Sequence, residues 1–444
     1  MRRIGKRVFA LLPVVGLFFA GLVILAAQFG VHGPTWATNR ANLHIYQGGA
    51  IARAGTIYDR NGVVLAQTVD GRRDMPGGAV LRRATLHAVG DPQGFVATGA
   101  HSAFRGPLVG FSRAGGLFDL LAYDRGNDIT LSIDSRLNRV AWEALNGRPG
   151  TVGLFNYQTG EVIVMVSSPS YDPLDKPRNM ANNPAFEGVY LNRLLQGLYT
   201  PGSTFKVITA YAALTHMPDV MTREFTCRGR FATGEGYVTC MAQHGTLNLE
   251  RAMAVSCNSV FAQLAVELGD AQMQAAAQRL GFNQRFRAGN QVPLSVSRFS
   301  RTPRDPLELG WAGIGQHTTL ANPAHMMMIM GAVANEGRGV APVLTRADAP
   351  LGVSLLWQAR TAIRIDPAIA AQLRRILLAS VDDQRMGGKT GTAQVDDGRP
   401  HAWFFGFSSD PRSPYAVVVV VQNGGGGLAQ AVPIATRVLR EATG

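Results

Sequence analysis

The N-terminal segment places the strongest restriction on how this chain can fold. Residues 8–30 contain no charged side chain, and four basic residues precede them within residues 1–7. As a helix this stretch would be roughly 34 Å long, enough to cross the hydrocarbon core of a membrane. Positive charge is retained on the cytoplasmic side of membranes. The sequence therefore predicts a cytoplasmic tail at 1–7, a single transmembrane anchor at 8–30, and the rest of the chain outside the cytoplasmic membrane.

A cleaved secretory signal peptide is the competing interpretation of this segment. Ala26 and Ala27 are small enough to form a processing site. The apolar run is longer than the usual core of a signal peptide, which favours a retained anchor.

Composition narrows the class of protein further. A chain of 444 residues with 46% hydrophobic content can bury one large core or two moderate ones. The net charge of +13 is spread along the chain, and no motif that reads nucleic-acid bases accompanies it. We therefore expect attraction to an anionic envelope surface and no nucleic-acid partner.

Lysine is rare in this chain, although basic residues are common. Of the 43 basic residues, only Lys6, Lys176, Lys206 and Lys389 are lysine. Where positive charge alone is needed the chain uses arginine, so each lysine is a candidate for a function that requires an amine.

Three cysteines are too few for a disulfide scaffold. Cys227 and Cys240 flank a turn-rich segment, and an exported compartment predicts a disulfide between them, with Cys257 left as a free thiol. The alternative is a zinc site that includes His244, but no fourth ligand is evident nearby in the sequence. The disulfide is therefore the favoured prediction, with no metal and no cofactor.

Residues 31–128 predict a small membrane-proximal domain. Short strand-like pieces at 55–58 and 63–65 are joined by the turn Asn61-Gly62. His44, His87 and His101 have no spacing typical of metal ligands, so we expect them at the surface or in packing.

Residues 129–444 predict a second domain of α+β class, an antiparallel sheet covered by helices. Apolar alternation and turns predict a hairpin of strands at 151–157 and 161–167, and further strands at 389–395, 402–407 and 415–422. Apolar residues at helical spacing predict helices at 135–145, 203–216, 247–280, 321–335 and 430–441.

Three short motifs in this domain carry side chains suited to acyl transfer. Ser203 and Lys206 lie one turn apart at a predicted helix start, so the amine can take the hydroxyl proton. Ser256 and Asn258 fall in an expected turn between helical runs and offer a second hydroxyl and an amide. Lys389 opens a strand with the sequence Lys-Thr-Gly-Thr, whose Gly391 permits close approach of a ligand to the backbone. Each motif alone is common in proteins.

Together and in this order, the motifs resemble the Ser-x-x-Lys, Ser-x-Asn and Lys-Thr-Gly set of penicillin-recognising serine enzymes. Other segments are similar to class B penicillin-binding proteins, and they extend the resemblance over 129–444. They are residues 191–201 before the nucleophile, Tyr171-Asp172-Pro173, Gly315-Gln316, Trp403-Phe404 and, in the membrane-proximal domain, residues 55–62. His317 stands where the family often has a small residue, and we interpret it as a packing or rim residue.

The resemblance implies a peptidoglycan D,D-transpeptidase that cross-links stem peptides ending in D-Ala-D-Ala and is acylated by β-lactams. Ser203 would be the nucleophile, Lys206 the general base and Ser256 a proton relay. Lys389 would lower the pKa of Lys206 by repulsion between like charges. The expected substrate-binding residues are Asn258, Lys389, Thr390, Gly391 and Thr392.

Other activities on the same fold remain open. No Glu-x-x-x-Asn pattern lies between Asn258 and Lys389, which argues against a class A β-lactamase. A D,D-carboxypeptidase needs no new motif. A β-lactam-sensing protein needs only the acylation step, and a scaffold protein needs no reaction at all. Residues 31–128 are too few for a glycan polymerase domain, so we expect a separate polytopic membrane polymerase as partner.

Overall fold

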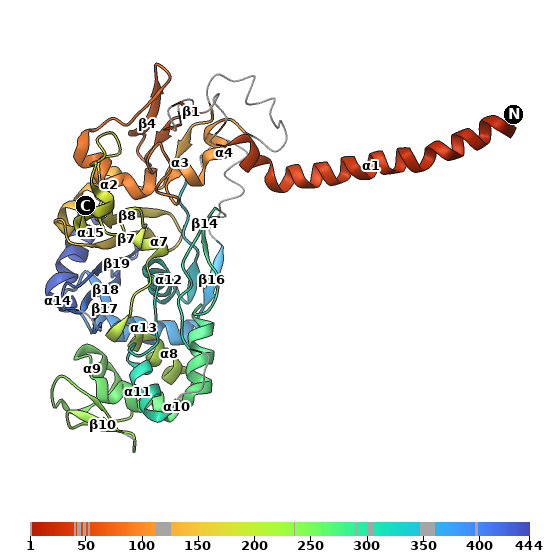
Figure 1. Ribbon diagram of the computed structural model, residues 1–444. Coiled ribbons are helices and arrows are strands. Elements are labelled where there is room, and N and C mark those ends of the chain that lie inside the picture. The colour runs from red at the N-terminus through yellow and green to blue at the C-terminus, as the bar shows by residue number, and fades with distance from the viewer. Residues whose placement is uncertain are drawn as a thin grey trace.

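The computed structural model of the protein describes residues 2–39, 41, 46–47, 50–51, 54–111, 126–234, 236–289, 291–300, 305–346, 360–395 and 398–444. Helix α1 (Arg2–Ala37) extends away from the rest of the molecule (Figure 1). Its segment Leu11–Gly33 is long and apolar enough to cross a membrane, and most of it is exposed, with Phe29 and Gly33 near its end packed against the rest of the protein. Among the described residues it is the one helix of this kind, which agrees with the prediction of an apolar span near the N-terminus.

A five-stranded antiparallel sheet forms the centre of the C-terminal part, in the order β17-β18-β19-β7-β8. The predicted hairpin at 151–167 is present as β7 and β8. The five strands are β7 (Gly150–Asn156), β8 (Val162–Ser168), β17 (Met386–Ala393), β18 (His401–Ser408) and β19 (Tyr415–Val421).

Both faces of this sheet are buried. Alternate residues of a strand point to opposite faces, and each face packs against a different set of helices. Val417 and Val419 pack in the same cluster as α6 (Ser135–Leu145) and α15 (Val432–Thr443). Val418 and Val420 belong to the larger cluster that includes α12 (Pro323–Ala334). The sheet therefore lies between helical layers, which confirms the predicted α+β class and explains the unbroken run of valines in β19.

The helices agree with the predicted ranges in most places, with one informative difference. The range 203–216 begins with a 3₁₀ helix, η3 (Gly202–Phe205), and only then continues as α8 (Lys206–His216). The range 247–280 is divided into α9 (Leu249–Ala254) and α10 (Asn258–Arg279), with the expected turn between them. The structure adds α2 (Gly78–Val89), α11 (Pro306–Gly313) and α13 (Pro367–Leu378), which were not predicted.

The membrane-proximal region forms a four-stranded sheet in the order β5-β4-β3-β6. Its strands are β3 (Ile57–Tyr58), β4 (Val64–Val69), β5 (Arg72–Asp74) and β6 (Ile129–Thr130). Strand β6 pairs in parallel with β3. The first residues of the second predicted domain, which begins at residue 129, therefore form part of this sheet.

Side chains also join the two regions. Arg82 of α2 donates two hydrogen bonds, of 2.7 and 2.6 Å, to the nearly buried carboxylate of Asp172. His87 and His101 are buried within the protein, and His44 lies outside the described residues.

Candidate active site

Ser203 lies on the tight turn that precedes α8, where a glycine shapes the backbone. Gly202 has φ 54°, a left-handed conformation that glycine adopts without the cost that a Cβ atom imposes. A Cβ atom at this position would lie 2.9 Å from the Thr392 carbonyl oxygen on β17. Glycine therefore lets the turn that carries Ser203 pack directly on the strand that carries Lys389, which brings the first and third motifs together.

The amine of Lys206 connects the first two motifs. Its Nζ lies 3.1 Å from the Ser203 hydroxyl and 3.1 Å from the Ser256 hydroxyl. It also lies 2.6 Å from the Ser256 carbonyl and 2.6 Å from Oδ1 of Asn258. The side chain of Lys206 is fully buried. Three of the predicted site residues therefore surround one buried nitrogen atom.

A neutral amine can satisfy three of these four contacts. An uncharged amine has two N–H bonds and one lone pair, and the two shortest contacts are to oxygen atoms that only accept hydrogen bonds. Both N–H groups can therefore donate to the Ser256 carbonyl and to Asn258, which leaves the lone pair to accept from a serine hydroxyl. Burial lowers the pKa of Lys206 well below its ordinary value, and the nearby charge of Lys389 lowers it further. Burial, rather than the expected repulsion, is the larger cause.

The second motif is held in a strained turn between α9 and α10. Ser256 has φ 55°, an uncommon conformation for a residue with a Cβ atom. Nδ2 of Asn258 donates a hydrogen bond of 2.9 Å to the Thr239 carbonyl, which fixes the orientation of the amide. Oδ1 of Asn258 therefore points toward Lys206 and accepts a hydrogen bond from its amine.

The third motif lies on β17, an edge strand of the sheet. Lys389 is almost fully buried, and burial lowers its pKa to about 7. Its Nζ donates a hydrogen bond of 3.0 Å to the Thr390 carbonyl. Thr390 is half-buried and Thr392 is exposed, whereas Gly391 packs tightly, since a Cβ atom there would meet Thr204 at 2.8 Å. The strand thus presents two threonine residues at its open edge beside the nucleophile.

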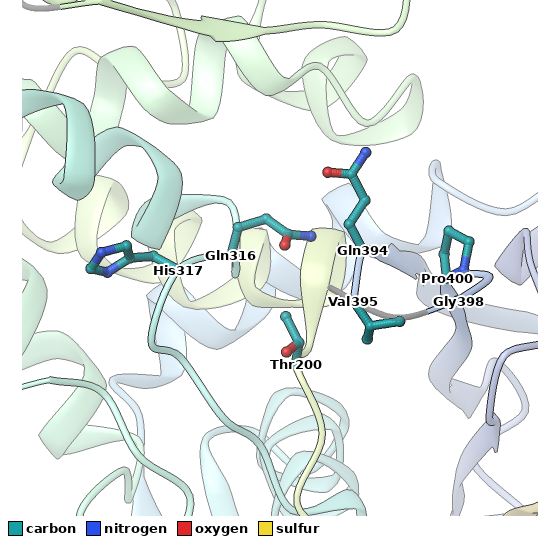
Figure 2. Close-up of a pocket in the computed structure, with 7 residues that line it drawn as sticks. All are labelled: Thr200, Gln316, His317, Gln394, Val395, Gly398 and Pro400. Carbon is teal, nitrogen blue, oxygen red and sulfur yellow. The ribbon is translucent and has the colours of Figure 1, made fainter.

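A cavity of about 620 Å³ is lined by residues close in sequence to the first and third motifs, although no residue of the motifs themselves lines it. The Gly202 N–H donates a hydrogen bond of 2.9 Å to the Gly315 carbonyl, which joins the nucleophile turn to the segment that carries His317. Figure 2 shows how the lining side chains come from three separate parts of the chain. The lining residues are Thr200, Gln316, His317, Gln394, Val395, Gly398 and Pro400. The sequence pattern predicted a rim position for His317 but gave no reason to single out Thr200, Gln394 or Pro400, because a cavity is a property of the folded chain.

The predicted disulfide between Cys227 and Cys240 is not formed, since all three cysteines are free. Sγ of Cys240 instead lies 3.8 Å from Sγ of Cys257 and 3.5 Å from Nδ1 of His244. The hydrogen bond between the thiols of Cys240 and Cys257 is the main reason that the pKa of Cys240 is lowered. Among the described residues, Cys227, Cys240, His244 and Cys257 form a group able to hold a metal ion. The sequence pattern omitted Cys257 because it is distant from Cys240 along the chain.

Comparison with known proteins agrees with the geometry of the site. The penicillin binding protein transpeptidase domain matches residues 150–440. The peptidoglycan D,D-transpeptidase PbpA of Mycolicibacterium smegmatis is 30% identical over 347 residues, which cover 68% of each protein.

Solved structures of penicillin-binding protein A from Mycobacterium tuberculosis are similar over 88% of this chain, at 26% identity. The alignment covers 100% of the chain in one crystal structure of that protein, with a TM-score of 0.74. It covers 98% of the chain in the imipenem acyl-enzyme complex, with a TM-score of 0.75. The chain therefore belongs to the penicillin-binding protein transpeptidase family.

Proposed function

We propose that this protein is a peptidoglycan D,D-transpeptidase that works through an acyl-enzyme on Ser203. The observation that carries the proposal is the contact of one buried amine, Lys206 Nζ, with the hydroxyls of Ser203 and Ser256 and the amide of Asn258. An uncharged lysine beside a serine is a general base beside a nucleophile. The PbpA relative is named as a peptidoglycan D,D-transpeptidase, and one solved neighbour is an imipenem acyl-enzyme complex.

In the first step the Ser203 oxygen attacks the carbonyl carbon of the penultimate D-Ala, and its proton passes to Lys206. The peptide C–N bond then breaks, and Ser256 relays a proton to the departing terminal D-Ala. The N–H groups of Ser203 and Thr392 stabilise the oxyanion, a contribution of about 3 kcal/mol per donor in such sites. Asn258 aligns the substrate amide.

Substrate binding falls to β17. Thr390 and Thr392 donate hydrogen bonds to the substrate carboxylate, and Gly391 lets the peptide backbone approach the strand. Lys389 attracts the carboxylate, whose negative charge favours the protonated form of the lysine. In the second step an amine of a neighbouring stem peptide attacks the ester, the new amide bond forms, and Ser203 regains a proton through Lys206. β-Lactams are acylating agents for the same serine.

The test has two parts that use the full chain. Intact-mass measurement after incubation with a β-lactam is expected to show one adduct, and peptide mapping to place it on Ser203. Release of D-Ala from a stem peptide, followed by cross-linked product when an amine acceptor is added, establishes the transpeptidase. Release of D-Ala with only hydrolysed product would indicate a carboxypeptidase. An adduct without turnover of the peptide would indicate a sensor.

The membrane arrangement is the second part of the proposal. With basic residues in the first turns of α1 and an apolar span after them in the same helix, residues 1–7 lie in the cytoplasm and the catalytic part lies outside. Protease added outside intact cells is expected to spare only the anchor.

We also propose that residues 31–128 form the membrane-proximal domain and residues 129–444 the transpeptidase domain. Through α1 and the membrane-proximal domain the protein would work beside a polytopic glycan polymerase. Consistent absence of such a polymerase after co-purification from membranes would contradict this partner.

A further inference from the structure

We propose that Cys227, Cys240, His244 and Cys257 bind a zinc ion that holds the Ser256–Asn258 turn in place. The ligand atoms of these four residues all lie within 4.8 Å of one another. Three thiols and one imidazole are a ligand set that selects zinc among the common divalent metals of proteins. This site goes beyond the transpeptidase reaction, because neither the acylation of Ser203 nor the attack of the acceptor amine on the ester requires a metal.

Three of the six distances between the ligand atoms are those of a tetrahedron around zinc. With Zn–S bonds of about 2.3 Å and Zn–N bonds of about 2.0 Å, tetrahedral geometry places two sulfurs about 3.8 Å apart and a sulfur and a nitrogen about 3.5 Å apart. Cys240 and Cys257 have their sulfurs 3.8 Å apart. Nδ1 of His244 lies 3.5 Å from the sulfur of Cys227 and 3.5 Å from that of Cys240. Three edges of the tetrahedron are therefore present.

The surroundings of the cluster suit thiolate ligands. The backbone N–H of Asn258 donates to Sγ of Cys240 at 3.2 Å, and the hydroxyl oxygen of Ser259 lies 3.5 Å from Sγ of Cys227. Hydrogen bonds of this kind orient metal ligands and stabilise their negative charge. A disulfide would need two sulfurs about 2 Å apart and would leave His244 and the third cysteine without a role.

The part of the protein that carries the ligands has little core of its own. Cys227 ends β9 (Phe225–Cys227), Cys240 follows β11 (Tyr237–Thr239), and His244 precedes β12 (Gly245–Leu247). Strand β10 (Arg230–Ala232) pairs with β11, and β12 pairs with β9. The two resulting sheets are separate, and each strand is three residues long. Two-stranded sheets are marginally stable alone, and small lobes of this kind are commonly fixed by a metal or disulfide. Figure 1 shows β10 at the end of the molecule opposite α1.

The fourth ligand connects this lobe to the active site. Cys257 lies between Ser256 and Asn258, both of which contact Lys206 Nζ. Asn258 is tied to the lobe as well, through the Thr239 carbonyl. Because Ser256 adopts a strained left-handed conformation, the turn needs support from its neighbours to persist. A zinc ion bonded to Cys257 would supply this support and would position the residues around Lys206 without touching the substrate.

The test measures zinc directly in the full chain purified in detergent. Elemental analysis after exhaustive desalting is expected to give about one zinc ion per chain. Replacing zinc with Co²⁺ is expected to produce the intense thiolate-to-cobalt absorption and a d–d spectrum typical of tetrahedral coordination. Removing zinc with a chelator is expected to lower the unfolding temperature and slow β-lactam acylation at least about tenfold, and both are restored when zinc returns. An acylation rate unchanged after verified zinc removal would overturn the proposed support of the turn.

Matched variants separate the metal from the chemistry. His244→Ala and Cys227→Ser are expected to weaken zinc binding by more than about 100-fold, a larger effect than the loss of an outer hydrogen bond. His216→Ala, an exposed histidine, is the control and keeps the metal. Ser203→Ala loses acylation and keeps the zinc, so failure of the proposed reaction is distinguishable from failure of this site. A reduced wild-type chain that takes up neither Zn²⁺ nor Co²⁺, or a Cys240–Cys257 disulfide in the exported protein, would overturn the zinc site.

Discussion

The side-chain nitrogen of Lys206 lies 3.1 Å from the hydroxyl oxygen of Ser203, inside a pocket where the lysine has no exposed surface. A lysine in water remains charged and cannot remove a proton, whereas this lysine has its pKa lowered well below the ordinary value by burial. The distance and the burial act together, since each alone would leave Ser203 a weak nucleophile.

Lys206→Arg is expected to keep the positive charge and lose the reaction. A guanidinium does not lose its proton in proteins, so acylation by a β-lactam should fall by about 100-fold or more, the range for removing a positioned general base. Stopped-flow measurement of acylation checks this, with Lys176→Arg as the control for the same change elsewhere. Near-normal acylation by a folded Lys206→Arg protein would move the role of base to Ser256 or Lys389.

Lys389→Arg is expected to change the pH dependence of the reaction. Burial lowers the pKa of Lys389 to about 7, so in the empty site its charge is lost as the pH rises through that value. Attraction of the substrate carboxylate should weaken accordingly, and kcat/KM for a D-Ala-D-Ala peptide should fall on the alkaline side. Arginine does not titrate, so the variant should be slower but lack this alkaline limb. An alkaline limb of the same midpoint in the variant would show that another group causes it.

Much of this arrangement follows from local sequence patterns. The apolar spacing of 135–145 predicts α6 with its correct ends, because Asp134 caps the helix through its side chain. The valine run of β19 predicts a strand but not its place between two helical layers. Helix α13 could have been predicted, since Asp366 followed by Pro367 is a strong helix start. Ser203 departs from the helix pattern because Gly202 imposes a left-handed turn for packing on β17.

The site was predictable where each motif is local, and not where distant segments meet. The spacing of Ser203 and Lys206 gives their contact directly. The meeting of Lys206 with Asn258 follows only from the family resemblance, because nothing in the spacing places these segments together. The cysteines show the limit most clearly, since Cys227 was predicted to pair with Cys240 in a disulfide, and both are free. Proximity along the chain favoured Cys227 with Cys240, whereas the fold places Cys257 and His244 beside both.

His317→Gly is expected to separate backbone strain from substrate contact. His317 has φ 63°, a conformation that costs a residue with a Cβ atom about 1 kcal/mol. The glycine variant should unfold at the same or a higher temperature, yet the KM for a stem peptide should rise severalfold because the side chain lines the cavity that Thr200 and Gln394 also line. Glu336→Gly is the matched control, since this exposed residue has φ 51° outside that cavity. Equal peptide kinetics in the two variants would remove His317 from substrate binding.

Acid is expected to destabilise the protein through its buried histidines. His325 is fully buried, with Nδ1 2.8 Å from the Ser297 hydroxyl and Nε2 2.8 Å from the Leu280 carbonyl, and burial lowers its pKa from 6.5 to about 4. Between these values the unfolded chain binds a proton that the folded chain does not, so stability is full above pH 6.5 and falls as the pH drops.

His325→Gln removes this titrating group. The variant should be less stable at neutral pH, yet its stability should change less between pH 6.5 and pH 4, by up to about 1.4 kcal/mol per pH unit. Unfolding temperatures measured through this range check the difference, with the exposed His216→Gln as control. The buried His87 and His101 also have pKa values lowered by burial, to about 4 and about 3, so part of the acid sensitivity should remain in the variant. Stability curves of the wild type and His325→Gln that run parallel from pH 6.5 to pH 4 would show that His325 takes up no proton on unfolding.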